Sequence, residues 1–172
     1  LLKEKAQVFP SDVSYRTFPG ASFVKLDITN ENDVKDAISK VKPHIVYHLA
    51  AFPDQKPSPE VIDRTNKVNV DGTLNLLKAC TSVKPLVVHI GSYKQYGEQR
   101  VPFLETDKLL GKSAYAQSKN EAEKLCLRYH LQYRIPVVLL RFPTLYGPGQ
   151  GKDLLIPYVI SSCLSGGEIS TT

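Results

Sequence analysis

The sequence has 172 residues, which at about 150 residues per domain predicts one domain with a short remainder. Hydrophobic residues make up 42% and charged residues 23%, so we expect a globular chain, and no apolar run reaches the roughly 18 residues of a membrane-spanning helix. The net charge of +5 is scattered without a basic block, which disfavours a nucleic-acid partner.

Short apolar runs alternate with helical patterns from end to end, which is typical of βαβ units and a parallel sheet. Strands are predicted from near-continuous apolar character, and helices from apolar residues three and four apart. In chain order we expect a strand at 22–27, a helix at 30–41 capped by Thr29 or Asn30, a strand at 44–51, a helix at 61–79, a strand at 86–92, a polar loop at 96–112, a helix at 113–133, a strand at 136–141 and, after a loop from residue 146, a helix at 154–164.

The predicted fold class is α/β, with an open, doubly wound parallel sheet of the Rossmann type. Right-handed crossovers over a parallel sheet leave few alternatives to it. Ligands of such sheets bind beyond the carboxyl ends of the strands. The residues expected there are Asp27 and Ile28, Ala50 and Ala51, Ser92, and the stretch from Arg141 to Gly147.

Three cysteines lie far apart without CxxC spacing. This favours neither a disulfide framework nor a zinc site, so we expect no metal, and a reducing, cytoplasmic location. The sequence opens at Leu1 without an initiator methionine or a leader, so we also expect an internal part of a longer chain.

Tyr115 and Lys119 stand four residues apart at the start of a predicted helix, so they share one helical face. A YxxxK pattern is weak by itself, because chance supplies roughly one match in a chain of this composition. Its context is stronger, since the helix follows a buried strand ending at Ser92 and precedes a second buried strand.

Eight segments spread over nearly the whole chain share the pattern of one family. They are LDIT (26–29), YHLAA (47–51), VNVDGTLNLLKAC (68–80), VVHIGSYKQYG (87–97), PFLETD (102–107), YAQSK (115–119), VVLLRFPTLYGPGQ (137–150) and LIPYVI (155–160). On these segments the sequence resembles the extended short-chain dehydrogenase/reductase family, in particular the NAD-dependent nucleotide-sugar epimerases and dehydratases.

The resemblance implies an enzyme with NAD as cofactor, NADP being left open, a nucleotide-sugar substrate, and the homodimer common among relatives. It assigns the catalytic roles to Ser92, Tyr115 and Lys119, and substrate contacts to Ser92 and Thr144. It assigns cofactor binding to Asp12, Asp27, Ile28, Ala50, Ala51, Asn69, Tyr115 and Lys119.

The expected chemistry depends on the acidity of Tyr115. A tyrosine titrates near pH 10, so a base near neutrality needs its pKa lowered by about 3 units, or roughly 4 kcal/mol. An ammonium about 5 Å away contributes roughly 3 kcal/mol, so we expect Lys119 to supply most of this and an oxidised nicotinamide the rest. Epimerisation through a transient keto intermediate is the leading hypothesis.

Two alternatives stay open: a one-way oxidoreductase, such as a keto-sugar reductase or a hydroxysteroid-type dehydrogenase, and a non-catalytic dinucleotide-sensing protein. Dehydration is disfavoured, because Tyr93 and Lys94 follow Ser92 where dehydratases carry an acid pair. The family's glycine-rich loop would lie before Leu1. We therefore expect an incomplete NAD(P)-binding domain at residues 1–147 and the start of a substrate-binding region at 148–172, most of which is missing.

Plainer structural roles are open for several residues. Tyr115 and Lys119 could be a surface packing pair, Ser92 could simply end a strand, and Asp27 could cap the following helix. Three histidines, His44, His48 and His89, are expected to be buried, hydrogen-bonded core residues rather than ligands, and glycine in place of serine at position 91 is expected to matter little.

Overall fold

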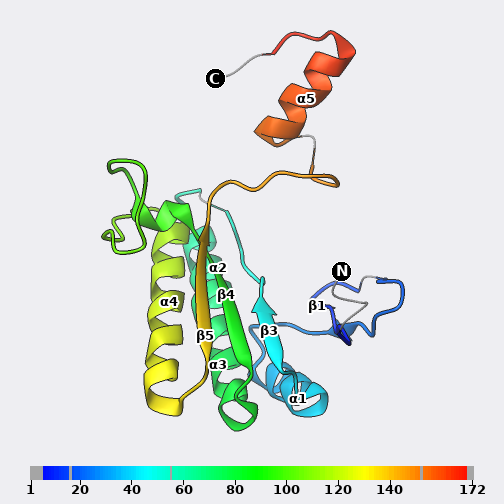
Figure 1. Ribbon diagram of the computed structural model, residues 1–172, viewed down its shortest axis with the longest axis vertical. Helices are drawn as coiled ribbons and strands as arrows, with labels where there is room; N and C mark the ends of the chain where they lie inside the picture. The colour runs from blue at the N-terminus through cyan, green and yellow to red at the C-terminus, as the bar shows by residue number, and fades with distance from the viewer. Residues whose placement is uncertain (1–5, 16, 55, 152, 170–172) are drawn as a thin grey trace. The chain divides into compact units, whose positions relative to one another are not determined.

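The computed structural model describes residues 6–15, 17–54, 56–151 and 153–169 (Figure 1). The chain divides into two compact units, Leu1–Arg141 and Phe142–Thr172, each described by itself below. None of the helices in these ranges combines the length and the hydrophobicity that are needed to cross a membrane.

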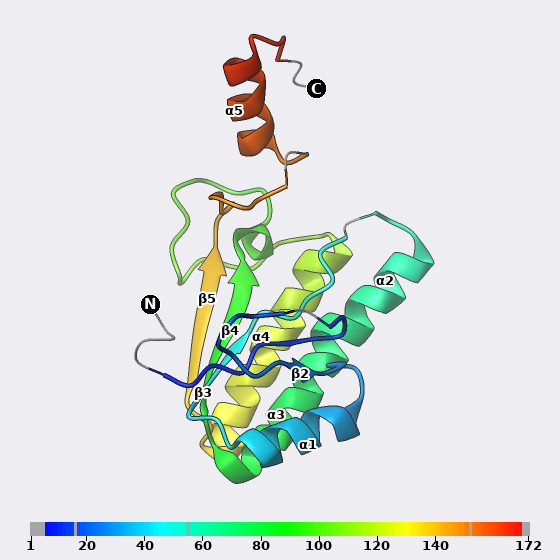
Figure 2. The ribbon, with the colours of Figure 1, turned by 90° about the vertical axis from the view of Figure 1, so that its right-hand side faces the viewer.

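The strands of the first unit are parallel, which confirms the α/β class. β1 (Ser11–Asp12) pairs with β2 (Val24–Lys25) in a two-stranded sheet. β3 (Ile45–His48), β4 (Leu86–Ser92) and β5 (Val137–Phe142) form a second sheet in that order, and His48 lies opposite His89 in the parallel β3–β4 pair. In Figure 2, α2, α3 and α4 lie on one face of this second sheet.

The first helix, α1 (Glu31–Val41), begins one residue after Asn30, whose side-chain oxygen accepts from the backbone N–H groups of Asn32 and Asp33. The alternative cap, Thr29, is not used in this way. The helix ends at Lys42, in the left-handed conformation. Local capping chemistry therefore sets both ends of this helix.

The helix expected at residues 61–79 is longer and has three parts. α2 (Pro59–Asn66) is capped by Ser58, a π-helical segment η2 (Lys67–Asp71) follows, and α3 (Gly72–Val83) continues to Lys84. A π-helical turn inserted in an α-helix changes the direction in which the following side chains point, and it often occurs at functional sites.

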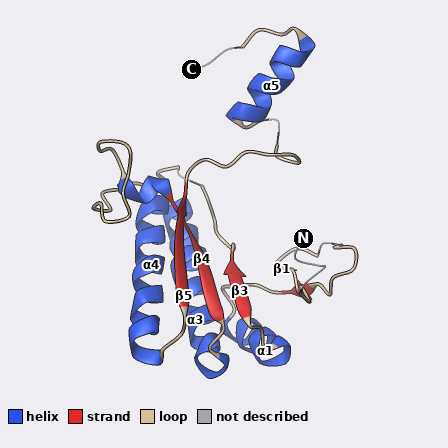
Figure 3. Cartoon of the chain, in the orientation of Figure 1, coloured by secondary structure: helices blue, strands red, loops and turns tan. Residues whose placement is uncertain are grey.

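The remaining elements follow the predicted order. A 3₁₀ turn, η3 (Tyr93–Tyr96), comes directly after β4, and a long loop joins it to α4 (Ala114–Tyr133), as Figure 3 shows. The second unit contains α5 (Leu155–Ser165). The two units divide after Arg141.

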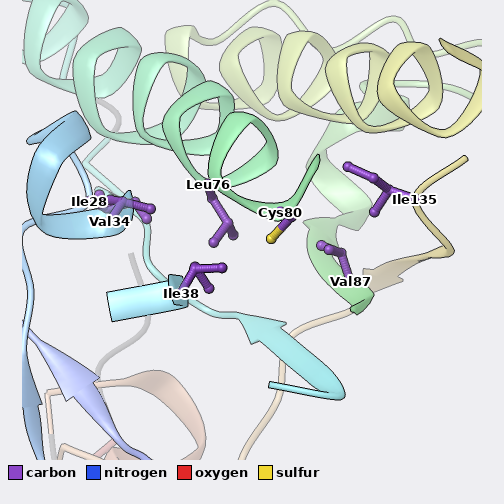
Figure 4. Packing of buried hydrophobic residues seen from close by; sticks show 7 residues of the cluster. All are labelled: Ile28, Val34, Ile38, Leu76, Cys80, Val87 and Ile135. Carbon is purple, nitrogen blue, oxygen red and sulfur yellow. The ribbon is translucent and has the colours of Figure 1, made fainter. Parts of the chain in front are cut away.

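Seven buried side chains form a core to which α1, α3, β4 and the residues just after β2 and just before β5 contribute (Figure 4): Ile28, Val34, Ile38, Leu76, Cys80, Val87 and Ile135. Gly72 permits a close approach at one edge of it, because a Cβ at this position would lie 2.8 Å from the Cγ2 of Ile28. This packing holds the chain just beyond the carboxyl end of β2 against α3.

Candidate active site

Ser92 is the last residue of β4 and also the N-cap of η3. Its Oγ accepts from the backbone N–H of Lys94 at 3.3 Å, while its own N–H donates to the Gln95 side chain at 2.8 Å. This reciprocal capping box stops the strand sharply. The Ser92 hydroxyl is thereby held at the carboxyl end of the central strand of the β3–β4–β5 sheet.

The first turns of α4 bring two further predicted residues to the same place. The Tyr115 side chain makes a hydrogen bond with the Ser92 side chain, and the Nζ of Lys119 lies 5.9 Å from the centre of the Tyr115 ring. Lys119 is only 4% exposed, and its ammonium donates to the Ile90 carbonyl at 2.8 Å. The structure thus brings the side chains of Ser92, Tyr115 and Lys119 together.

Burial dominates the electrostatics of these groups. It raises the pKa of Tyr115 above its ordinary value, against a smaller lowering by the hydrogen bond with Ser92. It lowers the pKa of Lys119 to about 8. The polypeptide alone therefore leaves the phenol protonated near neutrality, in contrast to the lowering that the spacing of Tyr115 and Lys119 led us to expect.

Two carboxylates lie at one end of the β1–β2 pair. The backbone carbonyl of Asp12 accepts from the N–H of Leu26 at 3.0 Å, which brings Asp12 beside the chain that leads into Asp27. The Asp27 carboxylate accepts from the Thr29 N–H at 2.9 Å and from its hydroxyl at 2.8 Å, and these bonds lower the pKa of Asp27. Asp27 is therefore an exposed, ionised group, and Asn30 rather than Asp27 caps α1.

Asn69 connects the segment after β3 with the second turn of α4. Its Oδ1 accepts from the Phe52 N–H at 2.7 Å, and its Nδ2 donates to the Phe52 carbonyl at 3.2 Å and to the Ser118 hydroxyl at 2.9 Å. The Ser118 hydroxyl in turn donates to the Tyr115 carbonyl at 2.8 Å. Asn69 is among the residues that the family resemblance suggested, whereas Ser118 is not, because no pattern in the chain distinguishes it.

The other predicted cofactor residues are small or apolar. Ala50 is exposed and Ala51 half-buried, both just beyond β3, while Ile28 is buried and its carbonyl accepts from Asn75 at 3.2 Å. Thr144 belongs to the second unit, where its side chain is exposed.

The histidine predictions are correct for one residue of three. His48 is buried, and its Nε2 lies 2.8 Å from the Thr73 hydroxyl, as expected of a hydrogen-bonded core residue. His89 is buried too, but neither ring nitrogen has a hydrogen-bond partner among the described residues. His44 is exposed and lies just before β3.

The residues present fit a dinucleotide. Among the described residues, the Lys119 ammonium has one hydrogen-bond acceptor, the Ile90 carbonyl, although an ammonium carries three donors and is costly to bury. Ribose hydroxyls of a bound dinucleotide could accept hydrogen bonds from the remaining N–H groups of the Lys119 ammonium. The ionised Asp27 offers the complementary group, a carboxylate that accepts from ligand hydroxyls or amines.

Comparison with known proteins gives one consistent family. The model of the family described as "NAD dependent epimerase/dehydratase family" matches residues 2–172. The chain is 31% identical to UDP-N-acetyl-alpha-D-glucosaminuronate decarboxylase of Bacillus cytotoxicus, covering 85% of the chain and 47% of that protein. It is 32% identical to UDP-glucuronate 4-epimerase 4 of Arabidopsis thaliana, covering 88% and 36% respectively.

Solved structures agree with this. A UDP-glucuronic acid 4-epimerase from Bacillus cereus, in complex with UDP-glucuronic acid and NAD, superposes with a TM-score of 0.75 at 30% identity, covering 87% of this chain and 48% of that one. MoeE5 in complex with UDP-glucose and NAD gives 0.79 at 30% identity, covering 96% and 56%. The chain thus spans about half the length, or less, of these relatives.

Proposed function

Because the chain belongs to the NAD dependent epimerase/dehydratase family, we propose that the protein binds NAD and epimerises a nucleotide sugar through a transient keto intermediate. The observation that carries this proposal is the cluster of Ser92, Tyr115 and Lys119 at the carboxyl end of β4. UDP sugars are the proposed substrate class, since the relatives named above act on or bind them.

Bound NAD⁺ would supply a hydride acceptor for the sugar carbon and a positive charge that favours the ionised form of Tyr115. Tyr115 takes the proton of a sugar hydroxyl onto its phenolate oxygen, and the Ser92 hydroxyl hydrogen-bonds the same sugar oxygen. Lys119 would bind ribose hydroxyls of the cofactor, and it keeps a cation close to the Tyr115 ring. The proton returns from Tyr115 when the keto sugar is reduced on its other face, so the enzyme ends in its starting state.

The residues that would hold NAD come from both sheets. Asp12 and Asp27 at the end of β1–β2 would bind the adenosine part, with Ile28 beside it. Ala50 and Ala51 leave room for the dinucleotide to pass over the end of β3, and Asn69 positions the segment that follows them. Thr144 remains the proposed substrate contact.

Tyr115→Phe tests the proposal. It removes the proton acceptor while keeping the ring, so interconversion of a UDP sugar should fall at least 100-fold while NAD still binds. Tyr133→Phe, at the exposed carboxyl end of α4, is the matched control and should keep full turnover. Unchanged turnover in Tyr115→Phe would refute this mechanism.

The same assay separates the rival functions. Net accumulation of oxidised or reduced nicotinamide would favour a one-way oxidoreductase, whereas NAD binding without any turnover would favour a dinucleotide sensor. Tyr93 and Lys94 after Ser92 argue against dehydration. We also propose a cytoplasmic homodimer without a nucleic-acid partner, and a monomeric mass by light scattering would contradict the dimer.

A further inference from the structure

We propose that Gln95 is a positioning residue that holds the Ser92 hydroxyl in place, and that residue 91 is glycine because the Gln95 side chain occupies the space of a Cβ there. The inference rests on the proposed role of Ser92. It goes beyond that role by assigning a second residue pair on which the geometry of the site depends.

Gln95 is completely buried, and both the oxygen and the nitrogen of its side-chain amide are hydrogen-bonded. Its Oε1 accepts from the Ser92 N–H at 2.8 Å, and its Nε2 donates to the Glu123 carboxylate at 3.0 Å and to the Asn120 Oδ1 at 3.1 Å. If the Gln95 amide were rotated by half a turn, its NH₂ group would face the Ser92 N–H, and two donors would lie opposite each other. The side chain therefore has one favourable orientation.

Glu123 is itself fixed by an ion pair. The Arg141 guanidinium binds both oxygens of the Glu123 carboxylate, through Nε at 3.0 Å and through Nη2, and its Nη1 donates to the Tyr96 hydroxyl at 2.9 Å. These bonds with Arg141 and the bond from Gln95 lower the pKa of Glu123 although it is buried. A two-point Arg–carboxylate contact is geometrically specific. Glu123 is thus a rigid acceptor for Gln95.

The contacts link three elements through one amide. β5 carries Arg141, α4 carries Glu123 together with Tyr115 and Lys119, and the end of β4 carries Ser92. Gln95 joins α4 to the Ser92 backbone, so it sets the distance between the Ser92 hydroxyl and the side chain of Tyr115. Acid–base catalysis is sensitive to such a distance.

Gly91 completes the arrangement. A Cβ at position 91 would overlap the Oε1 of Gln95 and would lie 3.0 Å from the Leu140 carbonyl oxygen. Gln95 could move aside only by giving up its bond with the Ser92 N–H. The glycine therefore matters more than the sequence suggested, because a larger residue would disturb Ser92 through Gln95.

The first test is Gln95→Met, which keeps the length of the side chain and removes its hydrogen bonds. We expect kcat for UDP-sugar interconversion to fall about tenfold with KM changed by less than about twofold, since the loss affects proton transfer rather than binding. Gln99→Met is the matched control: Gln99 anchors the same loop through the Tyr96 and Lys108 carbonyls, and it should keep kcat. An unchanged kcat in Gln95→Met, or an effect on KM alone, would overturn the inference.

The second test is a double-mutant cycle on kcat and on the unfolding midpoint. Gly91→Ala should lower kcat about tenfold in the wild-type background and by less than about threefold in a Gln95→Ala background. Additive effects on both quantities would overturn the coupling. The cycle on the unfolding midpoint can be measured even if the wild type shows no turnover. Loss of kcat in Ser92→Ala without any loss in Gln95→Met would refute this inference and leave the proposed function intact.

Discussion

Burial governs the charge state of Lys119 and of two histidines near it. The two histidines are His48 of β3 and His89 of β4, whose rings contact each other. The charged groups that act on His89 are Lys119 and Glu123, both from α4. Burial lowers the pKa of His89 to about 4 and that of His48 to about 3. Both rings are therefore neutral at pH 7.

The lowered pKa values of His48 and His89 predict how the free energy of unfolding depends on pH. In the unfolded chain they titrate near pH 6.5, so between about pH 4 and 6.5 the unfolded state binds protons that the folded state does not. The free energy of unfolding should therefore fall with falling pH, by about 2 kcal/mol per histidine at pH 5 relative to pH 7. His89→Phe should reduce that loss while leaving stability at pH 7 within about 1 kcal/mol, because His89 has no hydrogen-bond partner among the described residues.

Urea unfolding at pH 5 and pH 7 measures this effect. The exposed His44 provides the control, because it lies outside the buried His48–His89 pair and His44→Phe leaves that pair in place. An undiminished pH dependence in His89→Phe would show that His89 is not the group responsible.

At the scale of elements, the irregular parts of the fold carry the site. The π-helical segment η2 carries Asn69, which is buried and binds the backbone N–H and carbonyl of Phe52. The 3₁₀ turn η3 carries Gln95, whose side chain accepts from the Ser92 N–H. Regular helices on either side of η2 supply packing. The departures from regularity direct polar side chains at backbone groups that a continuous helix would leave unpaired.

Asn69→Leu tests this role of η2. It removes three hydrogen bonds and leaves the partly buried backbone groups of Phe52 unpaired, so the free energy of unfolding should fall by about 3 kcal/mol. The exposed Asn66 ends the preceding helix, and Asn66→Leu should change stability by less than about 0.5 kcal/mol. Equal effects of the two substitutions in urea unfolding would contradict the role assigned to Asn69.

At the scale of the molecule, the proposed cofactor site draws on two separate sheets of the first unit. Asp12 and Asp27 belong to the β1–β2 end, whereas Ala51, Asn69 and Lys119 lie about the β3–β4–β5 sheet. A single dinucleotide would contact residues of both. Binding should consequently stabilise the two sheets together.

Added NAD should raise the free energy of unfolding by about 2.7 kcal/mol at 100 times its Kd, with slower amide hydrogen exchange in β2 and in β4. Asp27→Asn should reduce this stabilisation, and Asp33→Asn, an exposed carboxylate in the first turn of α1, should not. Slower exchange confined to one sheet would contradict a site that spans both.

Much of the fold followed from local pattern, whereas parts of the site did not. The helix at 113–133 and the strand at 86–92 lie within one residue of their predicted bounds, because apolar periodicity and capping residues are local signals. Strands at 22–27 and 44–51 are shorter than predicted, since pairing with neighbours, not propensity, determines where a strand ends. The S-x-x-Q capping signature could have identified Gln95 beforehand.

The sequence by itself determined the order of strands and helices from residue 22 onward, the shared face of Tyr115 and Lys119, and the family, because each depends on spacing along the chain. Only the tertiary structure decided that burial raises the pKa of Tyr115, that Gln95 joins Ser92 to Glu123, and that a Cβ at position 91 would overlap the Gln95 side chain. The physical reason is that desolvation, ion pairing and steric overlap depend on residues that are distant in sequence and adjacent only after folding.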